Sequence, residues 1–281
     1  MSLAPHVLVA EPLAGCTTGH GVALDPARAH HLRRVLRLAD GAPLSLTDGS
    51  GVQAPALLDG DHARLTGDAV GVAPHGPRLV LLQALSKGRR AEDAVRTACE
   101  LGVDRLVPVI ADRTQGRPDA RAAAAVVERW HSVAVATLEQ SRGVRLAEVH
   151  GPVPTRAFAT EPAVPGAVRL VAVPGATPLP DVLAVAVLDA GSAPTEVAVA
   201  VGPEGGWSAA EVEALVAAGW SPVGLGPTVL RAEHAGPVAI AVIAAAVGRW
   251  RGDAGAEQGA GGAPSDDGRL DTRPSRSTDA L

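Results

Sequence analysis

The sequence predicts an α/β fold: a mostly parallel sheet with helices on both faces, preceded by a smaller β-rich domain. Three observations support this fold class. Between residues 78 and 250, short apolar runs alternate with helical patterns, which is typical of a parallel sheet flanked by helices. Residues 1–75 instead contain short strand-like runs separated by Asp-Gly turns. After residue 250, the chain is rich in Gly, Asp, Ser, Pro and Arg and has almost no apolar residues.

The first 75 residues are expected to form a small β-barrel. Asp-Gly pairs follow one another at residues 40–41, 48–49 and 59–60, where they mark turns between short strands. One short helix is predicted near Arg28–Leu36, and Pro74-His75-Gly76-Pro77 is predicted to be a linker. The predicted parts of the chain are therefore a barrel over 1–75, an α/β domain over 76–250 and a disordered tail over 251–281.

The alternating region is divided by its apolar periodicity. Its predicted strands are 79–85, 105–110, 169–173, 197–201 and 222–225. Its predicted helices are 90–101, 119–141, 209–218 and 235–250. The third helix has the clearest boundaries, because Ser208 and Glu211 have the spacing of a capping box and Gly219 follows the last apolar turn.

Composition narrows the function classes. The only two cysteines, Cys16 and Cys99, are far apart and lack metal-ligand spacing, so we expect reduced thiols, a cytoplasmic protein and no metal site. The N-terminus lacks the basic-then-apolar order of a signal peptide. The apolar stretch Pro237–Val247 is too short to span a bilayer, and we expect it in a core or a dimer interface.

Basic residues are unevenly distributed, although the formal net charge is −5. Arg28, Arg33, Arg34 and Arg37 precede the first acid of this stretch, Asp40. Such a stripe can neutralise phosphates, and a solvated helix face is the alternative. A second cluster, formed by Lys87, Arg89 and Arg90, follows the strand 79–85.

Two glycine loops follow predicted strands and indicate a ligand site. Gly202–Gly206 follows the strand 197–201, and Gly226-Pro227 follows the strand 222–225. Ligands of open α/β sheets bind at the carboxyl ends of strands, and glycine permits close approach of the backbone. Neither a P-loop nor a G-x-G-x-x-G fingerprint is present, so the residues alone leave ordinary turns as the alternative.

Four motifs in order resemble one family. GPEGGW (Gly202–Trp207) and LGPTVLRAEHA (Leu225–Ala235) resemble the C-terminal signature of SPOUT methyltransferases, and within them the ribosomal RNA small-subunit methyltransferase E family. His30–Gly51, Leu85–Arg113 and Leu138–Val149 are similar to further motifs of that family. The resemblance covers residues from about 24 to 250.

This resemblance implies an activity. The family methylates N3 of a uridine in 16S rRNA of the small ribosomal subunit, with S-adenosylmethionine held in a trefoil knot, and its N-terminal domain is a PUA-like barrel. SPOUT enzymes generally place their site at a homodimer interface. The chain departs from the pattern at His6, Ala232 and His234. The alternatives are a SPOUT enzyme that acts on tRNA or on a ribose 2′-oxygen, and a non-catalytic RNA-binding protein with this fold.

Individual roles follow from the matched positions. The resemblance assigns cofactor binding to Val173, Gly202, Pro203, Glu204, Gly205, Gly206, Leu225, Gly226, Pro227, Val229 and Leu230. It assigns RNA binding to Arg28, Arg33, Arg34, Arg37, Lys87, Arg142 and Arg145.

Arg231 and Glu233 are the candidate catalytic residues. Arg231 is expected to hold a phosphate or a uracil oxygen, or else to pair with Glu233. Glu233 is expected to accept the N3 proton, or else to be a carboxylate at a helix entry. Glu139 and Gln140 are expected to have a structural or RNA-side role, or to be solvated.

Overall fold

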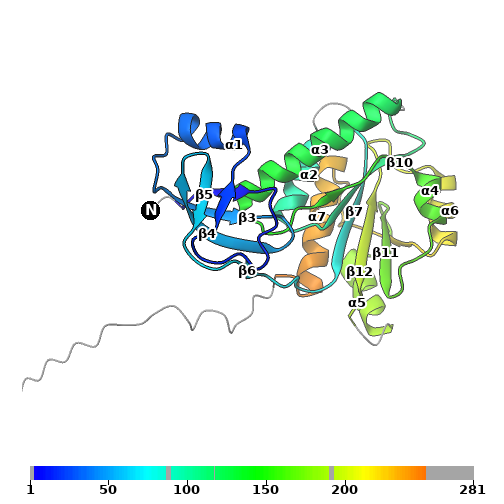
Figure 1. Cartoon of the computed structure of the whole chain (residues 1–281). Coiled ribbons are helices and arrows are strands. Elements are labelled where there is room, and N and C mark those ends of the chain that lie inside the picture. Colours follow the sequence, from blue (N-terminus) through cyan, green and yellow to red (C-terminus); the bar gives the residue numbers. More distant parts are fainter. Residues whose placement is uncertain (1–2, 87–89, 117, 190–192, 251–281) are drawn as a thin grey trace, which may run out of the picture. The chain divides into compact units, whose positions relative to one another are not determined.

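Two sheets organise the chain in the computed structural model, which describes residues 3–86, 90–116, 118–189 and 193–250 (Figure 1). The predicted RNA-binding residue Lys87 and the predicted tail 251–281 lie outside the described residues. No helix in the described part is both long and apolar enough to cross a membrane.

The first sheet has the path β1-β3-β4-β5-β2, with β6 also paired to β4. Its strands are β1 (His6–Leu8), β2 (Gly21–Ala23), β3 (Pro43–Thr47), β4 (Val52–Asp59), β5 (His62–Leu65) and β6 (Val70–Gly71). The pair β1–β3 is parallel and the others are antiparallel. Strand β4 turns Ala54, Ala56 and Leu58 toward a separate hydrophobic cluster, because alternate residues of a strand share a face.

The predicted helix near Arg28–Leu36 has two parts. Asp25 accepts a hydrogen bond from the amide of Ala27 and begins α1 (Pro26–His30). The wider π-helical turn η1 (His31–Val35) then continues it. Ala29 and Leu32 are buried in the hydrophobic cluster of the first sheet, whereas Arg28 and Arg33 are half-buried and Arg34 is exposed.

The second sheet is entirely parallel, which confirms the predicted α/β class with a mostly parallel sheet. Its path is β10-β8-β7-β12-β11-β13, with β9 also paired to β8. Its strands are β7 (Arg78–Ala84), β8 (Arg105–Ile110), β9 (Glu148–Val149), β10 (Val153–Pro154), β11 (Ala167–Ala172), β12 (Glu196–Val201) and β13 (Ser221–Val223).

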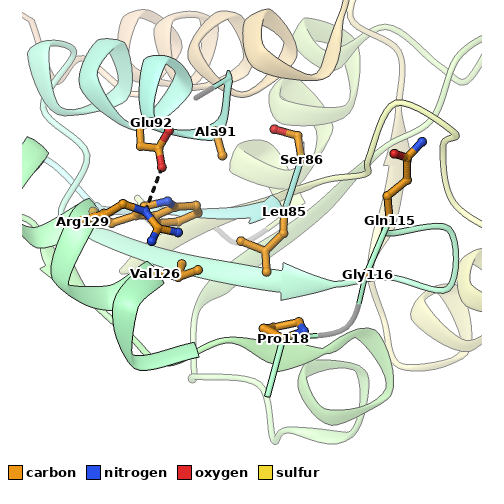
Figure 2. Close-up of a pocket in the computed structure, with 10 residues that line it drawn as sticks. Leu85, Ser86, Ala91, Glu92, Gln115, Gly116, Pro118, Val126 and Arg129 are labelled. Carbon is orange, nitrogen blue, oxygen red and sulfur yellow. Dashed lines mark hydrogen bonds and ion pairs between the residues drawn. The ribbon is translucent and has the colours of Figure 1, made fainter. Parts of the chain in front are cut away.

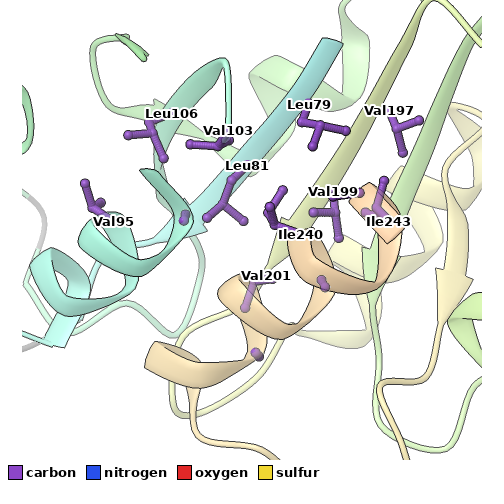
Figure 3. Close-up of a cluster of buried hydrophobic side chains, with 14 of the residues drawn as sticks. Leu79, Leu81, Val95, Val103, Leu106, Val197, Val199, Val201, Ile240 and Ile243 are labelled. Atoms are coloured by element: carbon purple, nitrogen blue, oxygen red, sulfur yellow. The ribbon is translucent and has the colours of Figure 1, made fainter. Parts of the chain in front are cut away.

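Helices cover both faces of this sheet, as predicted. They are α2 (Arg90–Glu100), α3 (Ala120–Ser141), α4 (Thr155–Thr160), α5 (Leu179–Asp189), α6 (Ala209–Ala217) and α7 (Ala232–Ala246). Leu81 of β7 packs in one cluster with Val95 of α2 and Ile240 of α7 (Figure 3). Its neighbour Val80 lies in the opposite cluster, together with Leu215 of α6. Successive side chains of β7 therefore pack in two hydrophobic clusters, one on each face of the sheet.

Several boundaries differ from the prediction. Helix α7 begins at Ala232 rather than at residue 235, so Glu233 lies inside its first turn and not before it. Strand β13 ends at Val223, which leaves Leu225 in the following loop. The structure also contains α4, α5, β9 and β10, which the periodicity did not reveal.

Hydrogen bonds connect the first sheet to α3. The carboxylate of Glu139 accepts from the backbone amide of Leu8 (3.0 Å) and from Nε of Arg28 (2.8 Å). Nε2 of His6 donates to the carbonyl of Gly143 (2.8 Å). Residues up to Trp250 cluster as one compact unit, so the division at residue 75 remains a prediction.

Candidate functional site

The loop Gly202–Gly206 is fixed by the capping box at the start of α6, which confirms that part of the prediction. Ser208 Oγ accepts from the amide of Glu211 (3.2 Å), and Glu211 Oε2 accepts from the amide of Ser208 (2.8 Å). The other oxygen, Oε1, accepts from the amide of Asp112 (2.9 Å) and the hydroxyl of Thr155 (2.6 Å). One buried carboxylate thus ties three segments together at the end of β12.

Side chains close around the same loop where glycine leaves room. A Cβ at Gly202 would lie 3.2 Å from the indole of Trp207. Gly206 has φ +68°, which L side chains rarely adopt. Arg113 donates from Nη1 to the carbonyl of Gly205 (2.8 Å), and Arg90 Nη1 lies 3.5 Å from Oε1 of Glu204.

The loop after β13 lies against the connection between β11 and α5. The amide of Gly224 donates to the carbonyl of Thr177 (2.8 Å), and the amide of Leu179 donates to the carbonyl of Gly224 (2.9 Å). A Cβ at Gly224 would lie 2.5 Å from the carbonyl oxygen of Ala176, so only glycine permits this approach. Gly226 then has φ +130°. Side-chain hydrogen bonds therefore hold the first glycine loop, and backbone hydrogen bonds hold the second.

The two loops and the end of β11 enclose a cavity of about 680 Å³. All residues predicted to bind a cofactor line it: Val173, Gly202, Pro203, Glu204, Gly205, Gly206, Leu225, Gly226, Pro227, Val229 and Leu230. The candidate catalytic residues Arg231 and Glu233 line it as well. This volume is in the range of small-molecule sites.

Sequence reasoning did not assign three further lining residues, Arg90, Arg113 and Trp207. Arg113 follows β8 and Arg90 opens the helix after β7, so their place at carboxyl ends of parallel strands is the signal that would have found them. Trp207 stood inside the GPEGGW segment, but only the close approach to Gly202 shows that it forms the cavity wall.

Arg231 and Glu233 flank the start of α7. Arg231 is the exposed N-cap residue of α7, and its side chain makes no capping hydrogen bond. Glu233 Oε2 is buried and has no hydrogen-bond partner among the described residues. This oxygen therefore does not pair with Arg231, which was the alternative role of the arginine. Glu233, which lines the cavity, keeps one acceptor without a partner.

Four arginines predicted to bind RNA have partners within the chain. Arg28 pairs with Glu139, and Arg33 pairs with Asp40 and donates to the carbonyl of Gly60. Arg142 Nη1 donates to the carbonyl of Ala4 (2.6 Å). Arg145 donates to the carbonyls of Ser50 (2.7 Å) and Val72 (2.5 Å).

The remaining arginines of the stripe are exposed. Arg34 lies in η1, and Arg37 follows it with φ 56°. Val35 between them is 60% exposed. The end of η1 therefore offers two arginines and an apolar side chain to solvent.

One group of side chains bears on the prediction of a metal-free protein. Donor atoms of Glu11, Cys16 and His20 lie within 4.8 Å of one another, and His20 Nε2 is 2.7 Å from Glu11 Oε1. The prediction of no metal site rests on the spacing of the two cysteines alone. Cys16 and Cys99 are both free thiols, and the absence of a metal stays a prediction.

Comparison with known proteins gives the family. The model of the RNA methyltransferase domain matches residues 74–244. A ribosomal RNA small subunit methyltransferase E from Synechocystis is 33% identical over 226 residues, which cover 79% of this chain and 72% of the relative. The protein of that name from Mycobacterium bovis is 32% identical over 241 residues, covering 83% and 89%.

Solved structures agree with this result. A putative methyltransferase from Legionella pneumophila, in complex with S-adenosylmethionine, has a TM-score of 0.74 at 26% identity and covers 87% of this chain and 98% of its own. A ribosomal RNA small subunit methyltransferase E from Neisseria gonorrhoeae, bound to the same cofactor, has a TM-score of 0.73 at 26% identity and covers 86% and 98%. The predicted family is confirmed: the chain belongs to the ribosomal RNA small subunit methyltransferase E family of RNA methyltransferases.

Proposed function

We propose that this protein transfers a methyl group from S-adenosylmethionine to N3 of a uridine in 16S rRNA of the small ribosomal subunit, in the cytoplasm. The observation that carries the proposal is the cavity at the carboxyl ends of β11, β12 and β13, around which both glycine loops, Arg231 and Glu233 gather. The names of the relatives support the RNA class, and two solved relatives bind this cofactor.

The lining of the cavity fits the cofactor. Glycines at 202, 205, 206 and 226 bring the backbone to the surface of the cavity, where carbonyl and amide groups can bind an adenine edge without adding charge. Leu225 and Leu230 supply apolar surface. When bound, S-adenosylmethionine supplies a methyl group on a positively charged sulfur. A neutral backbone lining suits this chemistry, because the positive charge disappears on transfer.

Arg231 and Glu233 have complementary roles in the proposal. The exposed guanidinium of Arg231 binds a uracil oxygen or the adjacent phosphate and stabilises negative charge on the base. Glu233 keeps a buried acceptor oxygen without a partner, which is the group needed to receive the N3 proton. Much of the remaining rate comes from aligning N3 with the methyl group.

Backbone hydrogen bonds support a trefoil knot, and exposed apolar side chains support a homodimer. The loop after β13 is hydrogen-bonded to the connection before α5, where a knotted chain would cross itself. Val229 at the cavity is 80% exposed and Val238 on α7 is 37% exposed, as expected for a surface that a second copy covers. A mass of one chain at micromolar concentration would contradict the dimer.

The first sheet is proposed to be a PUA-like barrel that binds RNA. Arg34 and Arg37 are its best-placed phosphate contacts, because both are exposed. Arg28, Arg33, Arg142 and Arg145 act in this proposal mainly by fixing the first sheet and α3, since each already has a partner. Lys87 stays a predicted contact.

The deciding experiment is mass spectrometry of nucleosides from 16S rRNA of the host with and without the gene. We expect N3-methyluridine to disappear without the gene and to return with the wild-type gene. Loss of a different methylated nucleoside would keep the RNA methyltransferase class and refute the uridine N3 assignment. An unchanged nucleoside profile would refute catalysis and favour a non-catalytic RNA-binding protein.

A further inference from the structure

A second cavity, of about 300 Å³, lies beside the start of α2 (Figure 2). The segment after β7, the first turn of α2, the connection before α3 and one side of α3 form its walls. Arg90 lines the larger cavity, whereas the next two residues of α2, Ala91 and Glu92, line this one. The first turn of α2 therefore separates two cavities near the carboxyl end of β7.

Buried polar atoms without partners gather at the same edge of the sheet. Seven side-chain nitrogen or oxygen atoms of the described residues are buried and unpaired, and four of these belong to Gln83, Ser86, Glu92 and Glu233. Gln83 lies in β7 and Ser86 just beyond it, while Glu92 and Glu233 lie in the first turns of α2 and α7. Three of these atoms are pure acceptors and one is a hydroxyl. Of these residues, Ser86 and Glu92 line the second cavity, whereas Glu233 lines the larger one. Unpaired buried acceptors are costly, so the free oxygens of Ser86 and Glu92 indicate a ligand that donates N–H groups.

The second cavity combines this polar wall with an apolar one. Val126 and Trp130 of α3 contribute buried apolar surface. Glu92 Oε1 accepts from Nε of Arg129 (3.2 Å), whose side chain is 56% exposed. Figure 2 shows Glu92 above Arg129, joined to it by the dashed hydrogen bond. The cavity thus offers a flat apolar wall, free acceptors and a guanidinium that is open to solvent.

We propose that this cavity binds a nucleobase of the RNA substrate, from a nucleotide other than the methylated uridine. The base would leave its stack, lie against Val126 and Trp130, and donate N–H groups to Ser86 and Glu92. The guanidinium of Arg129 would bind its phosphate. Sequence-specific RNA recognition commonly uses unstacked bases in this way. The inference rests on the proposed RNA substrate, and the methylated uridine itself must occupy the larger cavity, where the methyl group is presented.

The first test is steady-state kinetics of the full chain on small ribosomal subunits, with tritiated S-adenosylmethionine. We expect Glu92→Gln and Val126→Phe to raise KM for the subunit about tenfold, because the first weakens a charge-assisted acceptor and the second fills the cavity. The affinity for S-adenosylmethionine should change less than twofold. Asp93→Asn is the matched control, since Asp93 is the next residue of α2 and pairs with Arg96 at the surface. An unchanged KM for both folded variants would overturn the proposal.

Crosslinking of the wild-type chain gives a readout that does not depend on variants or turnover. Ultraviolet irradiation of the protein with 16S rRNA, followed by mass spectrometry of peptides, should place a nucleotide adduct within residues 115–130. If a variant does not fold, the absence of an adduct in this segment decides against the proposal. Failure of the proposed function is distinguishable, because the wild-type protein would then leave uridine N3 unmethylated whether or not the adduct forms.

Discussion

Arg249 and Asp104 form a two-pronged ion pair at the base of the second sheet. Arg249 Nη1 lies 2.8 Å from Asp104 Oδ2, and Nη2 lies 3.0 Å from Oδ1. The same guanidinium donates to the carbonyls of Pro77 and Gly102, and Asp104 accepts from the amide of Leu79. Both side chains are largely buried, at 12% and 16% exposed. Arg249, which follows α7, is thereby bound to the residues that precede β7 and β8.

Removal of this guanidinium is expected to destabilise the protein. Arg249→Ala leaves a nearly buried carboxylate and two carbonyls without their donor, which should lower the free energy of unfolding by about 3 kcal/mol. Arg249→Lys should recover only part of the lost stability, because an ammonium group cannot reproduce the paired hydrogen bonds of the guanidinium to both oxygens of Asp104. Urea unfolding measures the loss. Arg96→Ala, which breaks an exposed pair, is the control and should cost about 0.5 kcal/mol. Equal losses for both alanine variants would contradict the structural role of Arg249.

Glu211 is expected to control cofactor affinity from outside the cavity. Glu211→Ala leaves the amides of Asp112 and Ser208 and the hydroxyl of Thr155 without an acceptor, so the loop Gly202–Gly206 loses its anchor. We expect binding of S-adenosylmethionine to weaken about tenfold or more in calorimetry. Glu213→Ala, on the exposed side of the same helix, should bind normally. Full affinity in the Glu211 variant would show that the loop needs no such support.

Arg231 is expected to act on turnover rather than on cofactor binding. Arg231→Ala should lower kcat about 100-fold, the usual effect of losing one group that stabilises a developing anion. Its affinity for S-adenosylmethionine should stay within about threefold, because that site is built from backbone groups. Arg156→Ala removes another exposed arginine and is the control. Normal turnover with Arg231→Ala would assign this residue to structure alone.

His6 should make stability depend on pH. Burial lowers the pKa of His6 below its ordinary value of 6.5, despite the carbonyl of Gly143 that accepts from Nε2. The unfolded chain then binds a proton more readily than the folded one, so stability is complete above pH 6.5 and falls as the pH drops below it. Thermal unfolding between pH 7.5 and 5 measures this slope. His6→Gln should have a shallower slope, and an equal slope in both proteins would exclude His6 as its source.

Much of the second sheet was predictable because its signals are local. The run Val197–Val201 and the pair Ser208 and Glu211 each specify their element within a few residues. The short helix α4 was not predictable, because it has six residues and no capping side chain. The start of α7 was placed three residues late, since its N-cap, Arg231, is not a residue type that signals a cap.

The residues of the candidate site were also predictable only where their signal is local. Glycine loops are visible in sequence, and the structure brings all their predicted residues to one cavity. The fate of the arginines is not visible, because each partner is remote in the chain: Arg28 meets Glu139, and Arg145 meets Ser50 and Val72. A run of arginines in the sequence does not show which of them form hydrogen bonds or ion pairs within the folded chain.

The central position of β12 has a consequence for synthesis. β12 lies between β7 and β11, and its first residue, Glu196, is opposite Arg78 of β7 in the strand register. The second sheet therefore lacks its central strand until residue 201 has left the ribosome. The first sheet needs only residues 6–71 for its own pairs. We therefore expect the nascent chain to fold its amino-terminal sheet early. Once β8 has been made, β7 stays without its other neighbour, β12, for more than 80 residues of elongation, when aggregation is the main hazard.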